Sequence, residues 1–469
     1  MRGAALALLL ALPARAQVKD PGTFVYALVG EVDTLDPQWE YDGVSHFAVD
    51  QVYEPLIGFK GPSVTAFEPL LASRVPSRAN GLISRDGRTY TFPIRKGVRF
   101  HDGSPLTAED ARWSLLRAML MDRSGGHSWL FLDPILGLQS ARGADGKPLP
   151  GLYERAAKAV RVEGDSVKVT LRRPFAPFLS VLAAYGYVAS KPCAVRAGAW
   201  DGGAGTWQSR LDPPKQSAAL YRTDCGSGPF SLQRWDQQDQ ELVLARAEGY
   251  WRRPASLARV VIRTVDEFSA RKLMLESGDA DAISVDRGTL PLLEHDPGVR
   301  VQDGLPLMEV HDAFMFGLRV TTAGNPLTGS GRLDGEGIPP DFFADRDVRL
   351  GFAEAFPYRR YIADVYRGKG RRAIGPLPMG LLGYDPKAPL LPEDPRDAAA
   401  RLRRARGGEV WKEGFRLACV YQEGKEARAQ ACAILKSVLE AMNPRFRVDV
   451  RGLQWSTMLA LEDQRKVPL

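Results

Sequence analysis

Residues 84–110 read SRDGRTYTFPIRKGVRFHDGSPLTAED and combine a strand pattern, a tight turn and a helix start. Apolar side chains alternate at Tyr90, Phe92 and Ile94, which predicts a strand with one face against a core. Pro93 has no amide hydrogen to donate, so this strand is expected to lie at the edge of a sheet or to end early.

The helix start follows a tight turn at 101–103. Thr107 is expected to be the N-cap, because its hydroxyl can accept a hydrogen bond from the amide of Asp110 while the Asp110 carboxylate accepts one from the amide of Thr107. Apolar residues at helical spacing follow this capping box: Leu115, Ala118 and Met119.

Strand and helix patterns alternate along the rest of the chain. Residues 23–29 predict a strand, and residues 160–171 predict a hairpin that turns at 163–165. Further on, the strand pattern of 415–421, a helix and the strand pattern of 446–450 predict a βαβ unit with parallel strands. The sequence therefore predicts an α/β protein.

Length and composition narrow the class of protein. The chain has 469 residues, too many for one hydrophobic core, so at least two lobes are expected. The net charge is a mild +7, and no basic-plus-aromatic pattern indicates nucleic-acid binding. Short basic clusters occur at Arg371-Arg372 and at 401–406, and the second is interpreted as the solvated face of a helix.

The first sixteen residues have the pattern of an export signal. Arg2 precedes an apolar run over 4–12, which is too short to span a bilayer. Ala14-Arg15-Ala16 then matches a cleavage site, so the mature chain is expected to begin at Gln17 and to be periplasmic. A short buried N-terminal helix is the alternative. The residue immediately after the cleavage site is Gln17 and not a cysteine, so a lipid anchor is not expected at that point.

Motifs for catalysis are few. The sequence has no H-E-x-x-H or G-x-S-x-G motif, and no lysine follows the glycine-rich turn at 226–229 as a phosphate-binding loop requires. The pair His101-Asp102 has the residue types of a general base and its orienting acid. Neighbours on a turn rarely face each other, so a structural turn is the preferred interpretation. The sequence predicts no enzyme, no metal site and no cofactor.

Four cysteines follow the export signal. An even number in an oxidising compartment can form disulfides, and four cysteines allow three connectivities. We expect Cys193 to pair with Cys225, and Cys419 with Cys432. Four buried thiols are the alternative. No C-x-x-C spacing supports a zinc site.

The loop after the first predicted strand is rich in acids and aromatic residues. Acids there can attract a cationic group, and rings supply apolar contact, so a ligand site is one interpretation. A solvated loop around a core tryptophan is an equally good one. The residues concerned are Asp33, Asp36, Trp39, Glu40, Tyr41 and Asp42.

The stretch 84–110 resembles the signature of the family 5 extracellular solute-binding proteins, the dipeptide and oligopeptide binders of ABC importers. Three further blocks agree in order. Leu35-Asp36-Pro37 precedes Tyr53-Glu54-Pro55-Leu56, Gly226-Ser227-Gly228-Pro229-Phe230 precedes Tyr250-Trp251, and Arg271 precedes Gly278-Asp279-Ala280-Asp281. Ser227 stands where the family usually has threonine, which is a minor departure.

This resemblance implies a two-lobe, class II periplasmic-binding-protein-like clamshell with an extra α+β domain inserted in the first lobe. By the same resemblance, the segment Tyr41-Asp42-Gly43 is expected to touch ligand. Trp39, from the same aromatic loop, is expected to contact the ligand as well. The expected domains are a signal peptide at 1–16, lobe one at 17–60 and 161–268, an inserted domain at 61–160, and lobe two at 269–469.

The resemblance also implies a function. We expect a periplasmic, monomeric binding protein that holds an oligopeptide or peptide-like solute between its lobes and delivers it to ABC permease subunits in the inner membrane. Other ligands of the fold, such as an opine, a glycan or a metal chelate, are alternatives, and an exported hydrolase is the alternative function. The family's Trp-x-x-Asp segment is expected beyond Leu469, so lobe two is expected to be incomplete.

Overall fold

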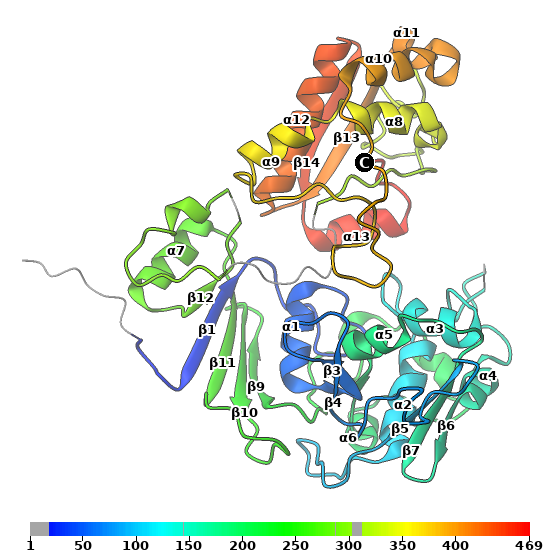
Figure 1. The fold of residues 1–469 in the computed structure, drawn as a ribbon, viewed down its shortest axis with the longest axis vertical. Coiled ribbons are helices and arrows are strands. Elements are labelled where there is room, and N and C mark those ends of the chain that lie inside the picture. The colour runs from blue at the N-terminus through cyan, green and yellow to red at the C-terminus, as the bar shows by residue number, and fades with distance from the viewer. Residues whose placement is uncertain (1–17, 144, 287, 303–311) are drawn as a thin grey trace, which may run out of the picture.

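The computed structural model describes residues 18–143, 145–286, 288–302 and 312–469. The predicted signal peptide at 1–16 lies outside the described residues. The chain forms two bodies with separate hydrophobic cores, one built from residues between 28 and 262 and the other from residues between 338 and 469 (Figure 1). The prediction of two lobes is confirmed. None of the helices in the described ranges has the length and apolar character needed to cross a bilayer.

A five-stranded mixed sheet with the order β12-β1-β11-β10-β9 stands at one side of the first body. Strand β1 pairs in parallel with β11 and β12, while β10 pairs antiparallel with β11 and β9. The strands are β1 (Thr23–Leu28), β9 (Phe230–Asp236), β10 (Glu241–Arg246), β11 (Arg259–Thr264) and β12 (Ala282–Ile283).

Helix α7 (Phe268–Ser277) and β12 lie in the first body, although the second lobe was predicted to start at 269. The amides of Asp281 and Ser284 donate hydrogen bonds to the carbonyl oxygens of Val25 and Ala27 in β1. Residues 269–284 therefore complete the sheet of the first body, and a lobe boundary at 269 is wrong. Gly278 ends α7 with a positive φ of 75°, a conformation that glycine adopts readily at a helix C-terminus.

A second sheet, with the order β5-β7-β6, lies in the first body. Strand β5 (Thr89–Pro93) is at its edge, as Pro93 predicts, and β6 (Val160–Glu163) and β7 (Ser166–Thr170) form the predicted hairpin. This sheet crosses the predicted domain boundary at residue 160, because β7 pairs directly with β5. The hairpin therefore belongs with the inserted segment and not with lobe one.

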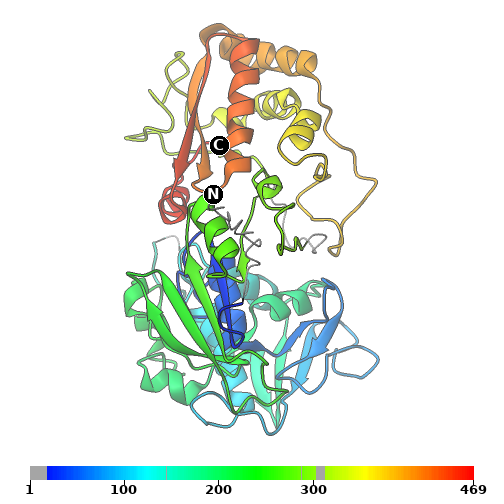
Figure 2. The same ribbon diagram turned by 90° about the vertical axis from the view of Figure 1, so that its left-hand side faces the viewer.

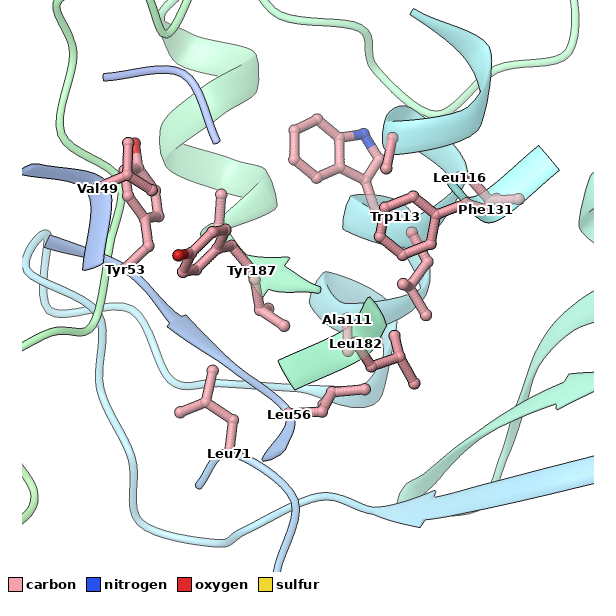
Figure 3. Packing of buried hydrophobic residues seen from close by; sticks show 14 of the residues in the cluster. Val49, Tyr53, Leu56, Leu71, Ala111, Trp113, Leu116, Phe131, Leu182 and Tyr187 are labelled. Carbon is pink, nitrogen blue, oxygen red and sulfur yellow. The ribbon is translucent and has the colours of Figure 1, made fainter. Parts of the chain in front are cut away.

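Helix α2 (Ala108–Leu120) packs against this sheet. Thr107 and Asp110 form both hydrogen bonds of the predicted capping box. The helix joins one continuous core that also includes α1, so the segment predicted as an inserted domain shares its interior with lobe one (Figure 3). Figure 3 shows Val49 and Tyr53 on one side of this core and Trp113, Leu116 and Phe131 on the other.

The remaining elements of the first body are short. Helices are α1 (Gly43–Val52), α3 (Trp129–Leu136), α4 (Leu152–Ala159), α5 (Phe178–Tyr185) and α6 (Lys191–Arg196). The small antiparallel pairs are β2 (Glu54–Pro55) with β8 (Tyr187–Val188), and β3 (Ile57–Phe59) with β4 (Phe67–Pro69).

The second body contains the predicted βαβ unit. Strands β13 (Phe415–Gln422) and β14 (Phe446–Leu453) are parallel and in register, and α12 (Glu426–Met442) connects them and packs on them (Figure 2). Phe415 and Phe446 stack at the centre of this core with ring centroids 4.5 Å apart. Its other helices are α8 (Arg346–Ala355), α9 (Tyr358–Asp364), α10 (Pro395–Arg404), α11 (Glu409–Glu413) and α13 (Trp455–Asp463).

The four cysteines divide into one disulfide and two thiols. Cys193 and Cys225 form a disulfide with Cα atoms 5.7 Å apart, as predicted. Cys419 and Cys432 are free and buried in the second body, so the prediction that they pair is wrong. They lie on β13 and α12, and their side chains are hydrogen-bonded as thiols.

Candidate ligand-binding site

Two acids of the loop between β1 and α1 form ion pairs within the first body. The guanidinium of Arg117 binds the buried carboxylate of Asp36, with Nη1 2.6 Å from Oδ1. The carboxylate of Asp33 binds the ammonium of Lys215. These two acids are therefore already paired inside the protein, which favours the structural interpretation of this loop over the use of these two acids in attracting a cationic ligand.

Trp39 is a core residue. Its side chain is 3% exposed and packs with Met121 and Ala218. The guanidinium of Arg123 lies 4.9 Å from the Trp39 ring centroid, and Arg123 Nη1 donates to the Trp39 carbonyl oxygen at 2.5 Å. The structure therefore favours the core alternative for this tryptophan and corrects its assignment as a ligand contact.

Asp42 and Gly43 form the start of helix α1. The Asp42 carboxylate accepts hydrogen bonds from the amides of Val44 at 3.0 Å and Ser45 at 2.8 Å, so Asp42 is the N-cap. Gly43 is the first residue of the helix, and no heavy atom lies within 4 Å of the position that a Cβ would take. The backbone at the helix start is thus open to solvent at Gly43. The positive N-terminal end of the helix dipole is already capped by the Asp42 carboxylate.

Tyr41 is the exposed ring beside this helix start, with 40% of its surface open to solvent. Its ring centroid lies 6.1 Å from those of His127 and Tyr185. Burial raises the pKa of the Tyr41 hydroxyl, and a hydrogen bond with Trp129 acts in the opposite direction. Trp129 is also exposed, so the two side chains form an aromatic surface able to contact an apolar group of a ligand.

A buried layer supports this aromatic surface. Glu40 is fully buried, and its Oε1 lies 3.1 Å from Nδ1 of His46. His127 is also fully buried, and its Nδ1 lies 2.8 Å from the Glu40 carbonyl oxygen. A carbonyl can only accept, so Nδ1 carries the proton. His127 stacks on Tyr185 at a centroid distance of 4.8 Å and thereby holds the ring that borders Tyr41.

The two histidines of this layer differ in charge. Burial lowers the pKa of His46, but the hydrogen bond and charge of Glu40, helped by Asp50 and Asp42, outweigh burial and raise that pKa to about 9. Burial lowers the pKa of His127 to about 4, with only partial opposition from the Glu40 carbonyl. At neutral pH His46 is therefore an imidazolium paired with Glu40, and His127 is neutral.

The second body approaches this surface through α13. A Cβ placed on Gly125 would lie 3.8 Å from the Asp463 carboxylate, so the loop that leads to His127 meets the end of α13. Figure 1 shows α13 between the rest of the second body and the top of the first. Helix α13 has no buried residue, and its Trp455, Met458 and Leu459 are only partly covered. The loop that leads to His127 and Trp129 therefore lies beside a partly apolar helix of the other body.

His101 has a structural role. Its Nδ1 lies 2.8 Å from the carboxylate of Asp224, and its Nε2 lies 2.9 Å from the carbonyl oxygen of Gly228. Asp102 instead accepts from Ser104 and Arg196. Both ring nitrogens are used in holding the turn, as the structural interpretation of His101-Asp102 predicts. Within the described ranges, no three acidic, histidine or cysteine side chains are grouped as metal ligands.

Sequence reasoning missed three members of the site. Trp129, Tyr185 and His127 come from segments more than 80 residues away from Tyr41, and none of them belongs to a motif. Only an expectation that α3 and α5 pack beside α1 could have brought them together. The exposure of Trp129 at the start of α3 is visible only in the structure, so the sequence carried no signal for it.

Comparisons with known proteins agree with this architecture. The family model of bacterial extracellular solute-binding proteins, family 5 Middle, matches residues 66–469. A periplasmic binding protein of Helicobacter pylori, solved in complex with the peptide STSA, superimposes with a TM-score of 0.68 at 21% identity, covering 93% of this chain and 75% of that one.

Two curated relatives are similar over most of this chain. A probable D,D-dipeptide-binding periplasmic protein of Escherichia coli is 25% identical over 370 residues, which are 78% of this chain and 58% of the relative. A di/tripeptide-binding protein of Pseudomonas aeruginosa is 26% identical over 463 residues, which are 96% of this chain and 76% of the relative. The chain thus spans between about three fifths and three quarters of these relatives.

The family match covers most of the chain, and the two-body α/β fold agrees with it. This is a family of solute-binding proteins and not of enzymes. The chain belongs to the bacterial extracellular solute-binding proteins of family 5.

Proposed function

We propose that this chain is the periplasmic, solute-binding component of an ABC importer and that it binds a short peptide or peptide-like solute between its two bodies. It is exported by the signal at 1–16, acts as a monomer and delivers its ligand to permease subunits in the inner membrane. It binds the solute without chemical change. The named relatives from Escherichia coli and Pseudomonas aeruginosa bind dipeptides or tripeptides, which supports this ligand class.

The proposal rests on the aromatic surface at Tyr41 beside the open helix start at Gly43, and on the approach of α13 of the other body to the loop at Gly125 that leads to His127. A peptide offers backbone donors and acceptors along its length and apolar side chains at intervals. Tyr41 and Trp129 supply apolar contact for the side chains, and the uncovered backbone at Gly43 leaves room for a peptide backbone to approach.

Closure would follow from a ligand that touches both bodies. A ligand that contacts only the first body has equal affinity for open and closed forms and shifts nothing. A ligand that also contacts α13 favours the closed form by the free energy of that second set of contacts. We propose two moving units. The first is the first body, which includes the inserted segment and the sheet up to β12. The second is the second body, which begins after residue 284.

The test is isothermal titration calorimetry of the purified chain with dipeptides, tripeptides and tetrapeptides, with mass spectrometry of the same solutions. The proposal predicts saturable binding, a ligand-dependent rise in melting temperature, and recovery of every peptide intact. At a hundredfold excess over Kd the stabilisation should be about 2.7 kcal/mol. Cleaved peptides would support the exported hydrolase instead, and absence of binding to any peptide would reject the peptide class.

A further inference from the structure

The net charge of the chain is concentrated in one segment. Residues 359–384 contain six basic side chains and one acid, a local charge of +5, while the whole chain carries +7. The basic residues are Arg359, Arg360, Arg367, Lys369, Arg371 and Arg372, and the acid is Asp364. They lie on α9 and on the loop that follows it.

At least three of these six basic side chains form no ion pair with a carboxylate of the described residues. Arg360 pairs with Asp364 at 3.2 Å. Among the described residues, Arg359, Arg367 and Arg371 form no ion pair, and all three are exposed. Arg372 lies over the ring of Tyr358 at 3.6 Å. 

The other basic cluster, at 401–406, is different. Arg401 binds Glu354 at 2.6 Å, Arg404 binds Asp347 at 2.8 Å, and Arg406 binds Asp341 at 2.5 Å. That cluster is therefore an ion-paired face within the second body. Compared with that cluster, the segment at 359–384 leaves more of its charge without an ion pair among the described residues.

Exposed apolar side chains follow directly on the same segment. Leu377, Met379 and Leu382 are 40%, 52% and 58% exposed, and Leu390 and Leu391 are nearly as open. Residues 365–394, between α9 and α10, contain no helix or strand, and Figure 2 shows them as a long loop beside the second body. The loop reaches the first body at one point, because a Cβ added to Gly380 would lie 3.9 Å from Cγ2 of Val64. Apolar side chains gathered on one exposed loop indicate an interaction surface.

We propose that residues 359–391 form a surface that docks on an anionic phospholipid bilayer. Negative headgroups match the free guanidinium groups, and the boundary of the acyl chains lies only a few ångströms below them, where Leu377, Met379 and Leu382 can insert. An acidic protein would satisfy the arginines but would need a shaped apolar recess for each leucine. A bilayer accepts apolar side chains at any spacing, which suits an irregular loop.

Docking of this kind concentrates the protein at the surface where an importer resides. Binding is expected to be weak and sensitive to salt, because it depends on long-range attraction between exposed charges. Weak binding keeps the protein free to exchange between membrane and solution. The proposed surface contains none of the residues of the candidate site at Tyr41, so the inference does not depend on which solute that site holds.

The experiment is co-sedimentation of the whole chain with large vesicles of phosphatidylcholine alone or phosphatidylcholine mixed with phosphatidylglycerol, at low and at high salt. Wild-type protein should bind only the vesicles that contain phosphatidylglycerol, and high salt should release it. The triple variant R359Q/R367Q/R371Q should lower the partition coefficient by about a hundredfold, since each charge near an anionic surface contributes about a fivefold effect.

Matched variants separate this surface from charge in general. R74Q/R78Q/R85Q removes three exposed arginines of the first body that form no ion pair among the described residues, and it should leave partitioning unchanged. L377S/M379S/L382S should weaken binding while keeping the charge. Equal losses in both arginine variants, binding to phosphatidylcholine alone, or no binding at low salt would overturn the proposal. Peptide titrations on the same variants report the ligand site separately and should be unaffected.

Discussion

The side chains of Asp36 and Arg117 face each other in the core of the first body with 0% and 2% of their surfaces exposed. Asp36 lies in the loop that leads to Tyr41, and Arg117 lies on α2. Gln38 also accepts a hydrogen bond from Arg117. This buried pair fixes the loop that carries the candidate site onto a helix of the inserted segment.

Loss of Arg117 should strongly destabilise the first body. Arg117→Met would leave the Asp36 carboxylate buried without a counter-charge, and breaking a buried pair in this way costs about 3–5 kcal/mol. Urea unfolding followed by tryptophan fluorescence measures the change. Arg360→Met removes one partner of the exposed pair with Asp364 and should change the free energy of unfolding by no more than about 0.5 kcal/mol. Equal effects would show that Asp36 has another partner.

Tyr41→Ala should weaken ligand binding without unfolding the protein. The ring is exposed, so its removal costs little packing, but it takes away half of the aromatic surface. An affinity loss of about tenfold is expected by calorimetry, typical of a truncated aromatic contact. Val162→Ala on β6 alters a side chain with nearly the same exposure, 39%, and should leave affinity unchanged. If Tyr41→Ala binds as tightly as wild type, that ring lies outside the site.

His127 should make the protein less stable in acid. Its pKa is about 4 when folded and about 6.5 when unfolded, so between these values the unfolded chain binds more protons. Stability should therefore fall as pH drops from about 6.5 to 4, by up to about 3 kcal/mol from this residue. Unfolding measured across this range should show a smaller decline in His127→Gln, whose amide can still donate to the Glu40 carbonyl.

The stability contributed by His46 should depend on pH in the opposite direction. Its folded pKa of about 9 lies above the unfolded value, so its contribution is fully present below about pH 6.5 and is lost as pH rises through 9. In His46→Gln the decline of stability between pH 6.5 and 9 should be reduced. An unchanged alkaline slope would show that the pair with Glu40 does not hold the imidazolium. The acid slope due to His127 should persist in this variant, which serves as its internal control.

The sequence predicted those parts of the fold that depend on local chemistry. The capping box at Thr107 and Asp110, the edge position of the strand that ends at Pro93, and the parallel pair in the second body all follow from hydrogen bonding and periodicity within a short stretch. The pairing of Cys193 with Cys225 was also predicted correctly.

Errors arose where distant segments meet. The hairpin at 160–170 joins β5 across 73 to 81 residues, and β12 joins β1 across 256, so neither domain boundary was visible in local composition. Trp39 was misassigned for a similar reason, because its neighbours Met121 and Ala218 are remote in sequence. Acids near an aromatic residue look alike whether they bind a ligand or an arginine such as Arg117.

Gly424 provides a test of the junction between the bodies. It follows β13 with a φ of 78°, and a Cβ added there would lie 2.9 Å from Cγ1 of Val29, just after β1. Gly424→Ala should therefore strain the backbone, by about 1 kcal/mol, and also push the two bodies apart, which should weaken binding of any ligand that needs closure. Melting temperature and calorimetric affinity measure the two effects.

A cycle of variants separates strain from displacement. Gly368→Ala has the same kind of backbone, with a φ of 74°, but nothing lies within 4 Å of the added Cβ, so it should lower stability without altering affinity. In Gly424→Ala combined with Val29→Ala, the contact is relieved while the backbone strain remains, so affinity should recover and stability should not. If affinity stays low in the double variant, the approach of Gly424 to Val29 does not control closure.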